Sequence, residues 1–392
     1  MPTPLSIIHL DLDAFFCAVE EQRDPRLRGK PFAVGGSPDG RGVVASCSYA
    51  ARQYGVHSAM PMARAVQICP GLKVVSTRHS AYKVASRKVM TRLRVLTSQV
   101  EQLSIDEAFL DVSDLPENAV LIGRKLQTEI RADLGLPCSL GIASNKLVAK
   151  IANDVGKAAA KGGTPPNALT VVPPGDEAEF LAPLPVEMLW GVGPKTAQKL
   201  ARMGVETIGD LAYIPEIQLE KRLGKFGWDL ARRAKGIDNR PIVTEREAKS
   251  FSRENTFSHD TSDGEVLRNL LREQAQDVTR RLRKHERTAR TVNIKIRWPD
   301  FTTLTRQTTL DRPTADEGVI ADTAIQLFEQ VWRSGRAVRL LGMGVSNIGE
   351  QPRQLGLWDQ DVKKERNLQD TIVELQQRFG EDAIWRGLER RE

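Results

Sequence analysis

The first clear pattern in the chain is an alternation of apolar and polar residues. Within "LSIIHLDLD", residues 5–13, the apolar Ile8, Leu10 and Leu12 alternate with the polar His9, Asp11 and Asp13. Successive side chains of a strand point to opposite faces. The pattern therefore predicts a strand with one apolar face and one face that carries acids.

Helical and strand patterns follow along the N-terminal half. Apolar residues recur at helical spacing in 81–100 and 120–134, which we expect to be helices. We expect a further helix over 145–155, capped by Ser144. The segments expected to be short strands are 31–36, 42–49 and 138–144.

The stretch "EQLSIDEAFLDV", residues 101–112, predicts a strand, a tight turn and a second strand. It sets Asp106 beside Glu107 between apolar residues. Two like charges about 4 Å apart repel by about 4 kcal/mol at an effective dielectric near 20. A turn lets both carboxylates face one site together with Asp11. Carboxylates with few histidines suit a hard cation, Mg²⁺ or Mn²⁺; a plain hairpin turn is the alternative.

The remaining chain divides by composition. A Gly- and Pro-rich stretch, 156–175, predicts a boundary, and short helices broken by glycine follow to residue 236. After the polar stretch 238–248, residues 250–348 predict a strand–helix–strand theme that occurs twice, and 350–392 form a tail.

Composition narrows the class of protein. The 392 residues, 40% hydrophobic and 27% charged, are typical of a globular protein with about two to four domains. We find no apolar run long enough to span a bilayer and no signal-peptide pattern at the start. The four cysteines fit neither a zinc motif nor a disulfide framework, which favours a reduced, cytoplasmic protein.

The net charge of +7 is unevenly distributed. Residues 280–306 contain nine basic and two acidic residues, an excess equal to that of the whole chain. Such a block indicates a polyanionic partner. The alternative is a solvated charged helix face. The nine basic residues are Arg280, Arg281, Arg283, Lys284, Arg287, Arg290, Lys295, Arg297 and Arg306.

Four segments together resemble the Y-family translesion DNA polymerases, most closely their DinB, or DNA polymerase IV, branch. The segments are "HLDLDAFFCAVE", "SCSYAARQYGV", "SIDEAFLDV" and "GIASNKLVAKIAND". The resemblance implies an α+β multidomain fold, a right-hand polymerase. The implied parts are a palm (1–17 and 76–165), fingers (18–75), a thumb (166–236), a linker (237–243), a little finger (244–349) and a tail (350–392).

The resemblance also implies an activity: a low-fidelity, template-directed polymerase for translesion synthesis and DNA repair. It would add deoxynucleoside triphosphates to a primer 3′ end with two Mg²⁺ ions, Mn²⁺ being a substitute. The implied partners are primer-template DNA, deoxynucleotides and a sliding clamp, with no membrane, for a monomer. Two alternatives are a nucleotide cyclase, which needs no DNA-binding domains, and a non-catalytic accessory paralogue, which would lack the acids.

Position by position, Asp11, Asp106 and Glu107 resemble the family's catalytic, metal-binding acids. Leu12 would offer its backbone carbonyl to an ion, and Asp13 would support the site. These roles come from the resemblance, whereas the costly acidic pair is visible in the residues themselves.

Phe16 is at the steric-gate position, where a ring under the sugar excludes a 2′-hydroxyl. Core packing is the alternative, as for any Phe. Small residues, Ala45 and Ser58, are at positions that cover the templating base. A loose cover implies low fidelity and tolerance of distorted templates.

Tyr49 and Arg52, in "SYAAR", match residues that contact the incoming triphosphate, and a guanidinium can clamp phosphate oxygens. Lys157 matches a lysine that meets the same phosphates. Here the chain reads "KAAAKGGTPPN" where the family usually reads Lys-Pro-Asn-Gly, so Lys161 is an alternative to Lys157.

The segment "LWGVGPKTAQKLARMGVETIGDL" resembles a helix-hairpin-helix element. Gly191 and Gly193 allow a tight turn, and Lys195 lies at the start of the next helix, whose backbone N–H groups can hold a phosphate. An ordinary helix connection is the alternative. The DNA-contacting residues expected in the little finger are Ser250, Ser252, Arg253, Arg281, Arg283, Lys295 and Arg297.

The tail contains "QLGLW", which resembles the short motif that docks bacterial polymerases on the sliding clamp. Leu357 and Trp358 can fill an apolar pocket, with Gln354 and Leu355 beside them. The alternative is that these residues pack against a helix predicted from the apolar spacing within 368–379.

Overall fold

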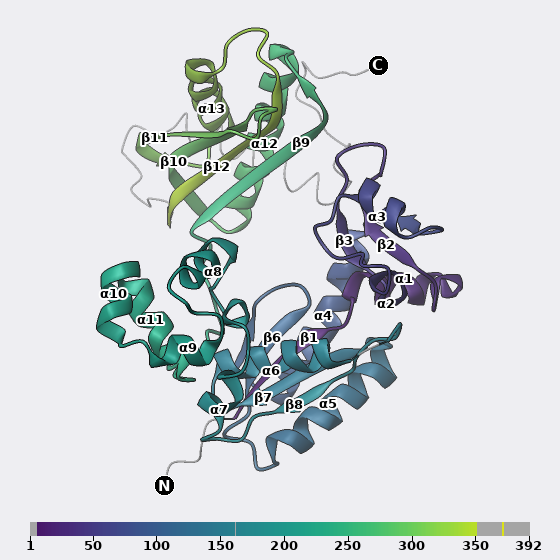
Figure 1. Ribbon diagram of the computed structural model, residues 1–392. Coiled ribbons are helices and arrows are strands. Elements are labelled where there is room, and N and C mark those ends of the chain that lie inside the picture. Colours follow the sequence, from purple (N-terminus) through teal and green to yellow (C-terminus); the bar gives the residue numbers. More distant parts are fainter. Residues whose placement is uncertain (1–5, 161, 351–370, 372–392) are drawn as a thin grey trace. The chain divides into compact units, whose positions relative to one another are not determined.

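The computed structural model describes residues 6–160, 162–350 and 371. The described chain forms two compact units (Figure 1): the first comprises the residues up to Glu247 together with Phe257–His259, and the second comprises Ala248–Thr256 and the residues from Asp260 onward. The expected clamp motif, Gln354–Trp358 with Leu355 and Leu357, the tail helix and Lys161 lie outside the described residues.

The first unit is built around a five-stranded mixed sheet. The strands, in sheet order, are β5 (Val100–Gln102), β6 (Glu107–Asp111), β1 (Ile7–Leu12), β7 (Cys138–Ala143) and β8 (Leu169–Val171). β1 is central and runs antiparallel to β6 and β7, while β8 runs parallel to β7. The strand expected at the N-terminus is therefore the middle of the sheet.

Helices cover both faces of this sheet. The helices α1 (Phe15–Arg23), α4 (His79–Leu96) and α5 (Ala119–Leu134) share one core with Ile8, Leu10 and Leu12. Helix α6 (Lys146–Ala159) packs on the other face, toward which the odd-numbered residues of β1 point. The alternation predicted for β1 thus separates one apolar core from a face under α6 on which His9 and Asp11 lie beside the apolar Ile7.

Three local expectations were wrong. Helix α4 ends at Leu96, and Val100 pairs with Leu110 in β5, because Thr97 takes an extended conformation and its hydroxyl donates to the carbonyl of Asp111. Asn145 caps α6 instead of Ser144, by accepting from the N–H of Val148. The third is the boundary expected at 156–175. Strand β8 lies inside this stretch, so the sheet of the first unit continues past residue 165, where the palm was expected to end.

The segment between α1 and α4 forms a small separate layer, the expected fingers. Its sheet has the order β3 (Val44–Cys47), β2 (Phe32–Gly35) and β4 (Lys73–Val75). The short helices α2 (Tyr49–Arg52) and α3 (Met62–Ile68) complete it. Small and apolar residues from both helices and all three strands fill the core of this layer.

The thumb region is helical, as expected. Its helices are α7 (Glu177–Leu181), α8 (Pro194–Ala201), α9 (Ile208–Tyr213), α10 (Glu216–Leu223) and α11 (Lys225–Ala234). They share an apolar core with α6. After α11 the chain has no regular structure until β9, but the expected linker is tied down: Lys146 Nζ donates to the Pro241 carbonyl, and Val243 N–H donates to Glu101.

The second unit repeats strand, helix, strand twice, as predicted. Its sheet has the order β11 (Thr303–Thr314), β10 (Arg287–Arg297), β12 (Val338–Glu350) and β9 (Ser250–Thr261), antiparallel throughout. Helices α12 (Gly264–Lys284) and α13 (Glu317–Val331) lie together on one face (Figure 1). Val292, Ile294 and Ile296 are buried toward them, as expected.

Two further facts concern the whole described chain. No helix in the described ranges combines the length and apolarity that a bilayer crossing requires. All four cysteines are buried free thiols, in agreement with the reading that they form no disulfide framework.

Candidate active site

Two of the three expected acids face each other across adjacent strands. Asp11 of β1 is the register partner of Glu107, the first residue of β6. Directly opposed residues of antiparallel strands project from the same face with their Cβ atoms about 5 Å apart. The sheet thus places two carboxylates side by side under α6.

A serine holds the turn that carries the third acid. The Ser104 hydroxyl accepts from the N–H groups of Asp106 and Glu107, both at 3.1 Å, and donates to the Asp106 carboxylate. Leu12 N–H donates to the Asp106 carbonyl at 3.0 Å. The turn is therefore locked both internally and against the end of β1.

Glu107 is surrounded by donors from β1 and α6. His9 Nε2 lies 3.3 Å from Glu107 Oε2, and Lys150 Nζ lies 3.2 Å from the same oxygen. The His9 imidazole and then the Lys150 ammonium lower the pKa of Glu107 to about 2. The carboxylate therefore remains ionised at any physiological pH.

The orientation of His9 is set by Asn153. The Asn153 amide nitrogen lies 2.9 Å from His9 Nδ1 and also donates to the carbonyls of His9 and Ser139. Because two carbonyls identify the nitrogen as the donor, Nδ1 is the acceptor and the His9 proton sits on Nε2, toward Glu107. Burial lowers the pKa of His9, which keeps the ring neutral.

Lys157 lies beside Asp11, the acid of β1. Its Nζ is 2.5 Å from Asp11 Oδ1 and 3.4 Å from Asp13 Oδ1. Asp13 is fully buried and accepts from the Ser139 hydroxyl at 2.9 and 3.0 Å and from Asn167 N–H at 3.0 Å. Asp13 thus supports the wall of the site, whereas Asp11 is the more accessible carboxylate.

The pKa of Asp106 reflects how close the other acids lie. Burial raises the pKa of Asp106, and the neighbouring charges of Asp11 and Glu107 act in the same direction. Burial raises the pKa of Asp13 in the same way. An added cation beside these groups would relieve both desolvation and repulsion.

The donors suit a hard divalent cation. Within the described ranges, no group of three or more His, Cys, Asp or Glu side chains is close enough to form a metal cage by itself. The donors at the site are nevertheless carboxylate oxygens, which Mg²⁺ and Mn²⁺ prefer. Cationic ammonium groups already lie against Asp11 and Glu107. The residues present therefore fit such an ion.

Apart from Lys157, the polar stripe of α6 is the part of the site that sequence reasoning missed. Lys150, Asn153, Asp154 and Lys157 recur at helical spacing on one face, a signal that was available in the sequence. Their approach depends on Gly141 of β7, where an added Cβ would lie 1.9 Å from the Ala149 carbonyl oxygen. Glycine at this position lets α6 lie directly on the sheet.

Phe16, the expected steric gate, is half-buried in the first turn of α1. Its ring stacks on Tyr82 of α4, with centroids 4.1 Å apart and an interplanar angle of 12°. The contact is part of the core of the first unit, so core packing is observed at this residue, and a role toward a ligand stays a prediction.

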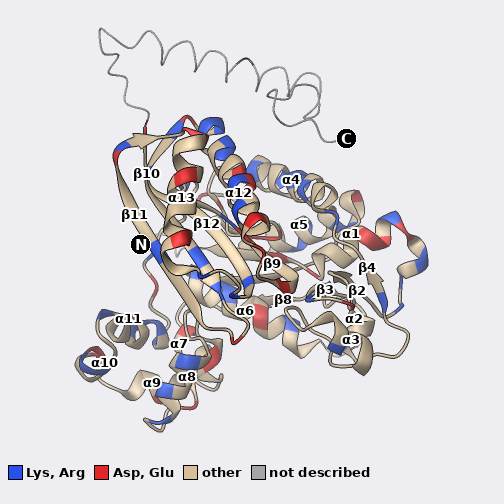
Figure 2. Cartoon of the chain, turned by 90° about the horizontal axis from the view of Figure 1, so that it is seen from above, with Lys and Arg blue, Asp and Glu red and all other residues tan. Residues whose placement is uncertain are grey.

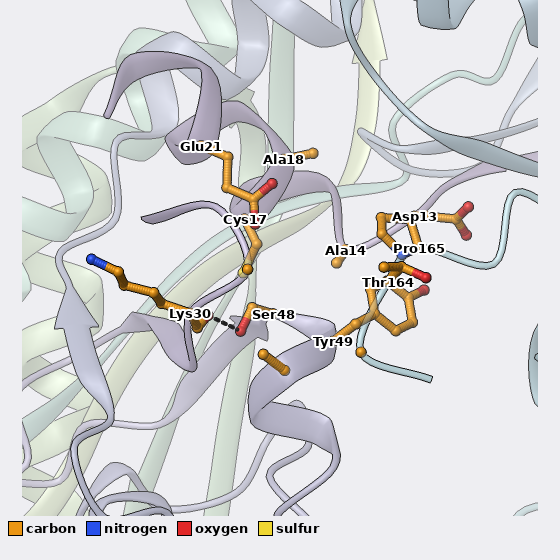
Figure 3. Close-up of a pocket in the computed structure, with 13 residues that line it drawn as sticks. Asp13, Ala14, Cys17, Ala18, Glu21, Lys30, Ser48, Tyr49, Thr164 and Pro165 are labelled. Carbon is orange, nitrogen blue, oxygen red and sulfur yellow. Dashed lines mark hydrogen bonds between the residues drawn. The ribbon is translucent and has the colours of Figure 1, made fainter. Parts of the chain in front are cut away.

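A small pocket lies beside Asp13 and Tyr49 (Figure 3). It holds about 100 Å³, below the roughly 300 Å³ at which ligand sites of small molecules begin. Tyr49 opens α2, and the Arg52 guanidinium lies 4.6 Å from the centroid of its ring. Burial, followed by the charge of Asp13, raises the pKa of Tyr49, which keeps the phenol protonated. Its lining includes Asp13 but not Asp11, Asp106 or Glu107, so the pocket lies beside these acids and does not contain them.

The thumb contains the expected hairpin. Gly191 has φ +104°, a conformation that favours glycine, and Gly193 is the N-cap of α8 with Pro194 in its first turn. Lys195 is exposed in that turn, and Arg233 donates to the Trp190 carbonyl at 3.2 Å. The hairpin thus presents a helix N-terminus and a lysine to solvent.

In the second unit, polar side chains form the sheet face opposite α12 and α13. One row crosses the sheet through Thr305, Lys295, Gly342 and Glu254. Lys295 Nζ lies 2.8 Å from Glu254 Oε2 across the glycine. The other rows are composed largely of Ser, Thr, Asn, Gln and Arg; they include Ser250, Ser252, Asn293, Arg297, Thr303, Gln307 and Thr309.

The basic block does not form one surface, contrary to expectation. Lys295 and Arg297 point to the open face, whereas Arg281 and Arg283 belong to α12 on the other side of the sheet. Arg281 pairs with Asp277, and Arg283 donates to the Ala315 carbonyl. Figure 2 shows basic and acidic residues intermixed along α12.

Arg253 is also separated from its sequence neighbours. It is the register partner of the buried Met343, whereas Ser252 and Glu254 flank it on the open face. Strand alternation places Arg253 on the face of the helices, at an edge strand. The expected DNA-contacting set is therefore divided between two faces.

Comparison with known proteins identifies the family. Residues 10–154 match the impB/mucB/samB family, 248–357 match its C-terminal domain and 174–205 match its HHH motif. The chain is 39% identical to DNA polymerase IV of Dehalococcoides mccartyi over 97% of this chain and 96% of the relative. It is 42% identical to DNA polymerase IV of Streptomyces coelicolor, covering 90% of this chain and 73% of the relative.

Solved structures agree. A Y-family DNA polymerase chimera of Dbh and Dpo4 superposes with a TM-score of 0.77 at 28% identity, over 88% of this chain and all of that chain. An insertion ternary complex of Dbh DNA polymerase gives a TM-score of 0.62 with the same identity and coverage. The right-hand polymerase fold expected from the sequence is confirmed. The chain belongs to the Y-family DNA polymerases, among relatives named DNA polymerase IV.

Proposed function

We propose that this Y-family DNA polymerase is a low-fidelity enzyme of translesion synthesis and DNA repair. It binds primer-template DNA and adds deoxynucleoside triphosphates to the primer 3′ end with two Mg²⁺ ions, for which Mn²⁺ can substitute. The observation that carries the proposal is the pairing of Asp11 with Glu107 on adjacent strands, beside a turn that fixes Asp106.

Each acid has a definite task in this mechanism. Asp11, Asp106, Glu107 and the Leu12 carbonyl would hold the ions. The chemistry that two Mg²⁺ ions supply is activation of the attacking oxygen and stabilisation of the leaving one. Glu107, with a pKa of about 2, holds no proton near neutral pH and is always ready as an oxygen ligand.

The polar stripe of α6 keeps these carboxylates usable. Lys150 donates a hydrogen bond to Glu107 at 3.2 Å, and the neutral His9 ring lies 3.3 Å from the same oxygen. The Lys157 ammonium pairs with the Asp11 carboxylate. It can exchange this partner for the triphosphate of an incoming nucleotide. Such preorganised charges act with little reorganisation during the reaction.

Nucleotide selection rests on residues from α1 and α2. Tyr49 and Arg52 contact the triphosphate, where a guanidinium can bind two oxygens at once. The Phe16 ring lies under the sugar and leaves no room for a 2′-hydroxyl.

Low fidelity follows from the fingers. Ala45 and Ser58 are small and exposed, and the Ser58 hydroxyl donates to the Ala45 carbonyl at 3.3 Å. Small side chains over the templating base cannot reject a mispair by steric exclusion. Distorted template bases are accepted for the same reason.

DNA is held without sequence preference. The start of α8, with Gly191, Gly193 and Lys195, binds one backbone phosphate. The open sheet face of the second unit, with Ser250, Ser252, Lys295 and Arg297, follows the phosphates of the duplex. Contacts of this kind position DNA and carry no sequence information.

The remaining features concern the setting of the enzyme. Gln354, Leu355, Leu357 and Trp358 tether the polymerase to a sliding clamp, which raises its effective concentration at the primer end. Four free, buried thiols suit a reducing cytoplasm. We expect a monomer, because the proposed site draws all its acids from one chain.

Single-nucleotide primer extension tests the proposal. Purified protein, Mg²⁺ and one deoxynucleotide are combined with primers facing an undamaged base or an abasic site. Extension opposite both, with frequent misinsertion at the undamaged base, supports the proposal. Extension that is strictly correct and stops at the abasic site would contradict the translesion role, and absence of extension would contradict the polymerase assignment.

A further inference from the structure

A carboxylate lies in the palm core directly beneath Phe16. Glu20 is 1% exposed and follows Phe16 by one turn of α1, so the two side chains share a helix face. A buried carboxylate is unfavourable unless it is paired and hydrogen-bonded. An apolar residue would fill this place without that penalty, so the partners of Glu20 need an explanation.

Both oxygens of Glu20 have a partner from the start of α4. The Tyr82 hydroxyl donates to Glu20 Oε1 at 2.7 Å, and Arg78 pairs with Oε2. Burial and the hydrogen bond to Glu20 raise the pKa of Tyr82 to about 12, so the hydroxyl stays a donor. The Tyr82 side chain is therefore fixed at its far end.

The ring of Tyr82 supports Phe16. Tyr82 is fully buried, and the two rings stack with centroids 4.1 Å apart at 12°. His79 packs edge-on against both rings, at 6.2 Å from Phe16 and 6.1 Å from Tyr82. Phe16 is half-buried, so part of its ring remains available to a ligand.

We propose that Tyr82, anchored by Glu20 and Arg78, is a positioning residue that keeps the Phe16 ring from receding and thereby sets the preference for deoxynucleotides over ribonucleotides. This inference rests on the proposed role of Phe16 as steric gate. A hydroxyl differs from a hydrogen by little more than an ångström, so a small retreat of the ring would admit the ribose.

Discrimination between deoxynucleotides and ribonucleotides distinguishes a positioning role of Tyr82 from a role in core packing alone. The quantity is kcat/KM for a deoxynucleotide divided by kcat/KM for the matching ribonucleotide. Damage to the palm core lowers both values together and leaves the ratio unchanged. A loosened gate raises ribonucleotide insertion relative to deoxynucleotide insertion.

The experiment compares Phe16→Ala, Tyr82→Phe, Glu20→Gln and a control. Tyr82→Phe keeps the stacked ring and removes its anchor; Glu20→Gln keeps an acceptor for Tyr82 and removes the charge that pairs with Arg78. The control, Glu129→Gln, removes a more exposed ion pair, with Arg92 further along α4. We expect Tyr82→Phe to lower the ratio by about tenfold, the order expected from losing a hydrogen bond to a charged group.

We expect Glu20→Gln to lower the ratio less, and Glu129→Gln to leave it unchanged. Tyr82→Phe added to Phe16→Ala should have no further effect, because no ring remains to be held. If Phe16→Ala leaves the ratio unchanged, the proposed gate is wrong. If Phe16→Ala lowers the ratio but Tyr82→Phe and Glu20→Gln do not, the gate stands and the positioning role of Tyr82 is refuted.

Discussion

Lys157 Nζ lies 2.5 Å from Asp11 Oδ1, so the last turn of α6 is tied directly to the central strand of the palm. Lys157 was expected from the resemblance to contact the triphosphate. Its ammonium also lies 3.4 Å from Asp13. In this structure the ammonium therefore pairs with Asp11 and Asp13, and its contact with a triphosphate stays a prediction.

The first prediction tests whether Lys157 binds the triphosphate in addition to pairing with Asp11 and Asp13. Lys157→Ala should raise KM for the deoxynucleotide by about tenfold, the value of one lost charge-assisted contact. Lys157→Arg should recover part of the loss, and Lys125→Ala, at an exposed lysine of α5, should behave as the parent. Steady-state kinetics measure KM, and an unchanged KM in Lys157→Ala would show that Lys157 serves only the acids.

The second prediction concerns the glycine beneath α6. Gly141→Ala should destabilise the first unit by about 2–4 kcal/mol, because the new methyl group meets backbone atoms that cannot rotate away. The nearest are the Ala149 oxygen at 1.9 Å and the Asn153 nitrogen at 2.5 Å. Gly193→Ala is the control, since its Cβ would have no neighbour within 4 Å. Thermal unfolding measures the stability of both variants. Equal unfolding temperatures for Gly141→Ala and Gly193→Ala would contradict this account of the packing.

The third prediction concerns the open sheet face of the second unit. Changing Lys295 and Arg297 to Ala should lower the magnitude of the salt-dependence slope of DNA binding by about two, one unit for each phosphate contact. The control changes Arg268 and Arg272, which are on α12 in the helix layer. Binding is measured across a salt series with two unrelated duplexes. Parallel slopes for the two double variants would exclude the open face as the DNA surface.

The fourth prediction follows from the thiols. Burial raises the pKa of Cys17 and of Cys138 to about 12. Because a raised pKa favours the neutral thiol, the reactive thiolate is scarce below pH 12, and raising the pH from 7 to 9 should expose no fast-reacting cysteine. A thiol reagent should detect four cysteines after unfolding and none rapidly before it. Rapid modification of the native protein at pH 8 would contradict the burial of these residues.

Much of the site could be predicted from the sequence because its signals are local. The alternation in β1 separates Asp11 from the core, and the adjacent acids in the hairpin are conspicuous at a turn. The register that opposes Asp11 to Glu107 was not visible, because pairing between β1 and β6 depends on contacts almost a hundred residues apart. Helical spacing could have identified the polar stripe of α6, but not that it lies over His9.

The expectations that proved wrong have a common cause. Contacts between distant parts of the chain outweighed the local sequence pattern on which each expectation rested. Val100 continues a helical apolar stripe, yet it completes β5 because pairing with Leu110 buries it. The basic block is continuous in sequence, yet β10 and α12 belong to different layers, so its charges face different surroundings. Arg253 is separated from Ser252 by strand alternation alone.

The central claim is that Asp11, Asp106 and Glu107 form a catalytic metal site. Asp106→Asn keeps the size of the side chain and an acceptor at the turn but removes the charge. The most direct measurement is single-turnover primer extension with Mg²⁺, beside DNA binding by the same protein. The account predicts that extension falls by at least about a thousandfold, as when one electrostatic group of an active site is lost, while the DNA affinity stays within about twofold of the parent. Extension by Asp106→Asn at a rate near that of the parent would contradict the account.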